Sequence, residues 1–184
     1  MDNELKRVFI METSFPWFFW LFPIVLTIHN IEEALWLPAF SKSAARYHKP
    51  VETFEFVFAL IVITFLAVSI TFWFSGSGKQ SLACYLFFAF NLMMLINVFA
   101  PHLLATVALK KYCPGLLTGI LLLVPTTTYL LVYGYQKEYY LFPRFWVVTI
   151  PFAAVVVGAI PILFKVGKYV QNLLNPNINR HAAP

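Results

Sequence analysis

The hydrophobic positions of this chain gather into five long stretches that contain few ionisable residues. Each stretch has at least 19 residues, close to the ~20 residues, at 1.5 Å rise each, with which a helix crosses a ~30 Å hydrocarbon core. A helix also satisfies its own backbone hydrogen bonds in lipid. The pattern therefore predicts an all-α polytopic membrane protein, a bundle of five transmembrane helices over residues 15–37, 53–74, 81–109, 115–133 and 145–164.

The composition excludes a disordered chain and an ordinary soluble domain. Of the 184 residues, 60% are apolar and 11% are charged, and the mean hydropathy is +0.75, whereas soluble domains carry about 25% charged residues. The connections between the apolar stretches are too short to hold a separate domain. We therefore expect one integral membrane domain over residues 1–184, with a frayed tail over residues 172–184.

The net charge of +5 arises almost entirely from Lys and Arg residues at the ends of the stretches. No basic patch interleaved with aromatic residues is present, so we expect no nucleic-acid partner. We also expect no nucleotide cofactor. The first residues mix both signs of charge and the first apolar stretch is too long for a signal peptide, so we expect no cleavable signal. Cys84 and Cys113 could pair only if the fold brought them together, and no disulfide framework is predicted.

Five spans place the two termini on opposite sides of the membrane. By the positive-inside rule, the side richer in Lys and Arg is cytoplasmic. This predicts an outside N-terminus and an inside C-terminus in the cell membrane, plasma or inner. The poorer side holds Lys6, Arg7, Lys79, Lys137 and Arg144, and the richer side holds Lys42, Arg46, Lys49, Lys110, Lys111, Lys165, Lys168 and Arg180.

The first predicted span contains an unusual polar motif, His29-Asn30-Ile31-Glu32-Glu33. Ionisable groups in hydrocarbon cost about 2.5–3.5 kcal/mol each on insertion scales, and so mark candidate functional sites. Positions i, i+3 and i+4 share one helix face, which would present an imidazole and two carboxylates together. This ligand set suits Zn²⁺ or a non-haem Fe or Mn ion. Two alternatives remain: one Glu is protonated, or both carboxylates reach the interface near Lys42 and Arg46.

The alternating direction of the helices predicts that further polar residues converge on this motif. His29, Glu33, Glu55 and His102 are all expected near the same membrane face. Pro101 favours a kink that would aim His102 inward. Asn91 lies eleven residues before His102, almost three helical turns, and therefore shares its face better than Asn97 does.

The ordered set of these residues resembles a known family. His29, Glu32 and Glu33 in the first span, then His102, then a Tyr-x-Pro-Gly turn formed by Tyr112, Pro114 and Gly115 are similar to the HXXEE-motif membrane protein family. The similarity in order and hydropathy covers nearly the whole chain. The resemblance implies a shared motif but no established activity.

Three functions compete at this stage. The first is a metal-dependent enzyme that hydrolyses or oxidises a lipid or another amphiphile. In it, Glu32 or Glu33 acts as a general base, the ligands are His29, Glu32, Glu33 and His102, and the supporting residues are Glu55, Asn91, Tyr112, Pro114 and Gly115.

The other two functions use the same acids differently. A small proton-coupled transporter would titrate Glu32 and Glu33 and would need a polar path through the whole membrane. A non-catalytic assembly protein would turn its carboxylates to the outside of the bundle, toward a basic residue of a partner. The oligomeric state is not predicted.

Overall fold

The computed structural model describes residues 15–43 and 52–174, and all regular structure within these ranges is helical. Five helices are long and apolar enough to cross a membrane, which confirms the predicted fold class. These spans are Trp17–Lys42, Thr53–Ser75, Leu82–Leu109, Leu116–Gln136 and Phe142–Leu174. The orientation of the bundle in the membrane stays a prediction, and part of the charge count on which it rests falls outside the described residues.

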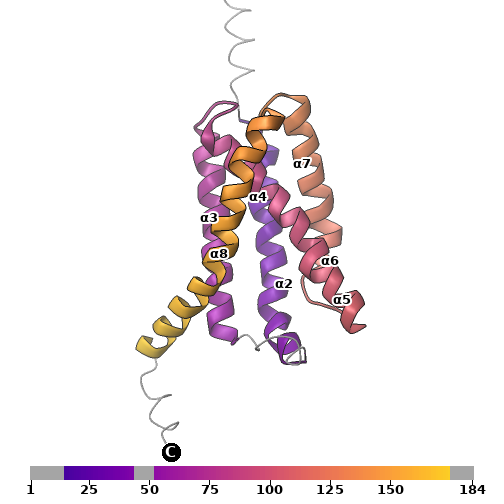
Figure 1. Ribbon diagram of the computed structural model, residues 1–184, viewed down its shortest axis with the longest axis vertical. Coiled ribbons are helices and arrows are strands. Elements are labelled where there is room, and N and C mark those ends of the chain that lie inside the picture. Colours follow the sequence, from indigo (N-terminus) through magenta and orange to yellow (C-terminus); the bar gives the residue numbers. More distant parts are fainter. Residues whose placement is uncertain (1–14, 44–51, 175–184) are drawn as a thin grey trace, which may run out of the picture.

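Three spans combine several helical segments, whereas the second and fifth are single helices. The first joins η1 (Trp17–Trp20) to α2 (Leu21–Ser43), and the second is α3 (Thr53–Ser75). The third comprises α4 (Leu82–Asn97), η2 (Val98–Leu103) and α5 (Leu104–Leu109). The fourth comprises α6 (Leu116–Thr118), η3 (Gly119–Leu123) and α7 (Val124–Gln136), and the fifth is α8 (Phe142–Leu174). In Figure 1, α2 and α4 run through the middle, with α3 and α8 on one side and α5, α6 and α7 on the other.

Two helices extend further than the sequence predicts. The helix α2 continues through Pro38 to Ser43, and α8 runs from Phe142 through two internal prolines to Leu174. Residues 172–174, expected to be frayed, are therefore helical, and the rest of that tail lies outside the described residues. Each proline lacks an N–H and so leaves one backbone carbonyl of its helix without a donor. Prolines are tolerated inside transmembrane helices because neighbouring groups can satisfy that carbonyl.

The half of the bundle in which α2 begins is filled with aromatic side chains. Phe19 lies at its centre, with ring centroids 5.3 Å from Phe74, 5.7 Å from Phe88 and 5.2 Å from Tyr139. All four side chains are buried. The rings of Phe88 and Tyr139 meet Phe19 edge-to-face and the ring of Phe74 is tilted against it, and this packing closes that half of the interior against polar groups.

The other half of the bundle is hollow. A cavity of about 710 Å³ lies between α2, α3, α4, α5 and α8, within the ~300–1,000 Å³ range of ligand pockets. Apolar side chains line most of it, and the polar side chains on its wall include Glu33, Asn97 and His102. The fold therefore sets the polar motif of α2 beside a largely apolar cavity.

Candidate metal centre

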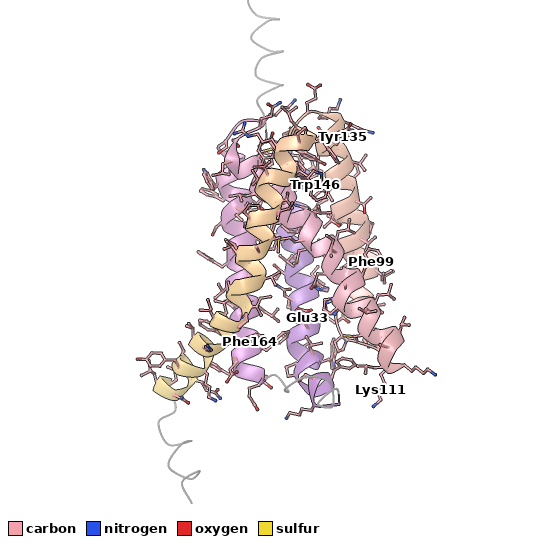
Figure 2. All side chains as sticks on the ribbon, viewed as in Figure 1. Glu33, Phe99, Lys111, Tyr135, Trp146 and Phe164 are labelled. Carbon is pink, nitrogen blue, oxygen red and sulfur yellow. The ribbon has the colours of Figure 1, made fainter. Side chains whose placement is uncertain are left out.

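Three of the predicted ligands meet at one point of the interior. The imidazole Nε2 of His102 lies 2.8 Å from Oε1 of Glu33, and Nε2 of His29 lies 3.7 Å from the same oxygen. One donor atom from each residue falls within 4.8 Å of the other two, and all three side chains are buried. Figure 2 places Glu33 in the bundle interior, nearer to Lys111 than to Tyr135 at the opposite end.

The hydrogen bonds of His29 leave its Nε2 lone pair without a partner. Thr118 Oγ1 donates to Oε2 of Glu32 at 2.6 Å, so the same hydroxyl can only accept from Nδ1–H of His29, 3.1 Å away. Nδ1 therefore carries a proton, and the neutral ring then has its lone pair on Nε2. Nε2, which has no hydrogen-bond partner in the described structure, faces the carboxylate of Glu33.

Glu32 has a different task from its neighbour Glu33. Its Oε1 accepts from the Gly115 N–H at 2.8 Å and from the Tyr112 hydroxyl, and its Oε2 accepts from the Thr118 N–H at 2.9 Å and from the Thr118 hydroxyl. Four donors thus occupy this carboxylate. It ties α2 to the start of α6 and is not in the group of candidate metal ligands.

This arrangement satisfies the backbone of a helix that begins at the depth of Glu32. The first N–H groups of a helix lack intrahelical partners, and lipid offers no water to replace them. Gly115 N–H and Thr118 N–H donate to Glu32, Leu116 N–H donates to the Cys113 carbonyl at 3.2 Å, and Leu117 N–H donates to the Tyr112 hydroxyl at 3.1 Å. Two effects raise the pKa of Tyr112 to about 12: partial burial, which is the larger, and the hydrogen bond to Glu32. The phenol therefore stays a donor at physiological pH.

The Tyr-x-Pro-Gly turn also brings the backbone close to His102. Gly115 has φ +93°, and a Cβ at this position would lie 2.6 Å from Cε1 of His102 and 3.1 Å from Cγ of Glu33. Only glycine fits both the backbone conformation and the space. His102, the residue on the other side of this contact, is buried. Just before it, Ala100 has a non-helical conformation (φ −137°, ψ 107°) that breaks the helix ahead of Pro101, where a kink was predicted.

Two predicted supporting residues do not reach the cluster. Glu55 lies on the first turn of α3, with its Cα facing Gly167 of α8, and is not among the residues that line the cavity. Asn91 is buried and donates to the Phe87 carbonyl at 2.8 Å. Instead, the Asn97 amide lies 3.1 Å from Nε2 of His102.

Sequence reasoning missed Thr118 and Cys113 as well as Asn97. Thr118 orients His29, and its position three residues after Gly115, one helical turn into the span, was the available signal. Cys113 Sγ lies 3.7 Å from Nδ1 of His102. Both cysteines are buried and unpaired.

Replacing Thr118 by valine tests the orientation of His29. The substitution keeps the shape of the side chain but removes the hydroxyl that accepts from Nδ1–H. Because such outer partners commonly account for 10- to 100-fold in metal affinity, we expect a loss of affinity of about that size. We also expect a stability loss of about 1–3 kcal/mol, because the buried Nδ1–H of His29 loses its acceptor and Glu32 loses one donor. Zn²⁺ titration of metal-depleted protein measures the affinity, and unchanged affinity would contradict the role assigned to Thr118.

Comparisons with known proteins agree with this motif. The profile of a family described as "Protein of unknown function with HXXEE motif" matches residues 20–130, which include His29, both acids, His102 and the Gly115 turn. The chain is 41% identical to the uncharacterized protein YrkK of Bacillus subtilis (strain 168) over 150 residues, 82% of this chain and 95% of that protein. No solved structure matches. The chain belongs to the HXXEE family, whose function is unknown.

Proposed function

We propose that this protein is a membrane-embedded, metal-dependent enzyme that acts on a lipid. His29, Glu33 and His102 form the ligand set, two imidazoles and one carboxylate. Three protein ligands of this kind leave a position open for water or substrate in catalytic zinc sites, and the same set holds non-haem Fe(II). A bound ion there would supply Lewis-acid or redox chemistry, according to its identity.

The observation that carries this proposal is the unpartnered Nε2 of His29. A buried polar atom without a partner costs free energy, and here a lone pair faces a carboxylate 3.7 Å away. Thr118 and Glu32 hold the ring in that tautomer. A cation bound between Nε2, Glu33 and His102 would relieve the repulsion and offset the cost of burying the carboxylate.

The interior arrangement favours this function over the two alternatives. A transporter needs a polar path across the bundle, but the aromatic side chains around Phe19 fill the half beyond the site. An assembly protein would expose its carboxylates, but Glu32 is 5% and Glu33 is 7% exposed, and both face inward. Burial also argues against carboxylates that extend to the interface.

One arrangement favours a second candidate, acyl transfer through a thiol nucleophile. Cys113 Sγ, the His102 ring and the Glu33 carboxylate form a row, with separations of 3.7 Å and 2.8 Å. A nucleophile, a base and a group that orients the base have this order in covalent catalysis. The two candidates share His102 and Glu33, but only the metal centre needs His29 and only the thiol chemistry needs Cys113.

Elemental mass spectrometry on detergent-purified protein, prepared without chelator, separates them. We expect about one equivalent of Zn, Fe or Mn per wild-type chain, lost in His29→Ala and Glu33→Gln and retained in the matched control Cys113→Ala. Circular dichroism verifies that each variant is helical. A metal-free, folded wild type would overturn the metal centre, and an acyl adduct that Cys113→Ala abolishes and His29→Ala preserves would establish the thiol chemistry.

A further inference from the structure

We infer that the cavity takes up one acyl chain of a membrane phospholipid sideways from the bilayer and presents the middle of that chain to the His29–Glu33–His102 cluster. This inference deepens the proposed function, because it takes the cluster as the reacting site and names the class and part of the substrate.

The depth of the cluster points to the chain and not to the headgroup. Glu33 precedes Lys42, the end of its span, by nine residues, and His102 precedes Leu109 by seven. These offsets correspond to about 13 Å and about 10 Å at ~1.5 Å per residue. The spans exceed a ~30 Å hydrocarbon core by roughly 5 Å at each end, which leaves the cluster roughly 5–9 Å inside a leaflet about 15 Å thick.

The cavity has an opening toward lipid. Five of the residues that line it are exposed: Ile96, Ala100, Pro101, Ala108 and Val157. The first four belong to the third span and the last belongs to α8, so the opening lies between these two spans. In a bilayer this surface faces acyl chains, and a chain can enter without crossing water.

The lining suits a hydrocarbon chain and excludes an anionic headgroup. Among the described residues that line the cavity there is no Lys or Arg, and a buried phosphate would need such a partner. The polar lining residue Asn30 is already hydrogen-bonded to Thr64 at 2.8 Å. Glu33, Asn97 and His102 lie together on one wall, with apolar residues such as Met93 and Ala153 toward one end and Leu109 and Phe164 toward the other.

Exposed lysines provide a place for the headgroup at the end of the bundle that is nearer to the cluster, where the first and third spans end. Three of them lie at or just after the ends of α2 and α5, and two lie in the last three turns of α8: Lys42, Lys110, Lys111, Lys165 and Lys168. Ammonium groups at this level attract anionic headgroups. A phospholipid held there would extend its chain past the cluster.

Photolabelling in vesicles tests this placement. Two phosphatidylglycerol probes carry the same diazirine, one at mid-chain and one beside the ester, in a phosphatidylcholine bilayer that contains the full chain. We expect the mid-chain probe to label buried Glu33, His102 or Cys113. Ala153→Trp, which fills the cavity, should lower this labelling about tenfold, whereas Ala154→Trp, at an exposed neighbour outside the lining, should leave it unchanged.

A second filling variant and one ligand variant keep the test decisive. Ala105→Phe reduces the cavity from the opposite wall, in case Ala153→Trp fails to fold. Labelling that survives both filling variants, or that comes from the ester-proximal probe instead, would overturn the inference. Labelling that persists in metal-free His29→Ala would show that the acyl chain binds without the metal. The labelling therefore tests chain binding, and the elemental analysis tests the metal centre independently.

Discussion

Replacing Glu32 by alanine is expected to destabilise the protein more than any other single change in the motif. The substitution removes one carboxylate but strands four donors: the Tyr112 hydroxyl, the Gly115 N–H, and the N–H and hydroxyl of Thr118. Breaking a buried charged network by removing one partner costs about 3–5 kcal/mol. In lipid no water compensates the exposed start of α6, and His29 loses its orientation as Thr118 turns.

The midpoint of thermal unfolding in detergent measures this loss, with Glu55→Ala as the matched control. Glu55 is also an acid inside a span, but it lies outside the cluster and the cavity lining, so its replacement should change stability little. Glu33→Gln should lower metal content with a much smaller loss of stability. Equal destabilisation by the changes at Glu32 and Glu33 would show that the two acids do not divide their tasks as described.

Replacing Gly115 by alanine should disrupt the site from the backbone side. The left-handed conformation alone costs an L-residue about 1–2 kcal/mol, and the new Cβ would lie 2.6 Å from Cε1 and 2.9 Å from Nδ1 of His102. The imidazole must move or the turn must open, and the turn is held by Glu32. We therefore expect a stability loss of about 3 kcal/mol or more and loss of the bound metal.

A double-mutant cycle identifies the cause. Removing the ring in His102→Ala should recover part of the stability that Gly115→Ala loses, because the clash is gone, although the metal site is then absent. Gly158→Ala serves as the control, since a Cβ there meets no atom within 4 Å. Additive losses in the double variant would refute a direct clash between Gly115 and His102.

The spans were predictable because what a bilayer requires of a helix can be recognised in one contiguous stretch of sequence. Every helix in lipid needs a run of apolar residues of fixed length, so hydropathy alone located all five spans within a few residues, except at the ends of α2 and α8. The extra length of α8 could not be read in the same way, because its last turns carry Lys165 and Lys168 and lie beyond the apolar stretch.

An ideal helical pattern could not predict which of the two asparagines, Asn91 or Asn97, contacts His102. Sequence spacing set Asn91 on the face of His102 under the assumption of 3.6 residues per turn. The π-type segment Val98–Leu103 and the non-helical Ala100 change the angular register between α4 and His102. Asn97 therefore contacts the imidazole, and Asn91 bonds to its own helix instead.

The sequence by itself determined that the protein is a multi-pass helical membrane protein, how many spans it has and which ionisable residues lie inside them as candidate site residues. These properties depend on composition and spacing along one helix. Only the tertiary structure decided which task each residue performs. Glu32 and Glu33 are adjacent, but side chains one residue apart point about 100° apart on a helix. The neighbours in those two directions, the start of α6 and the two histidines, make one acid a cap and the other a candidate ligand.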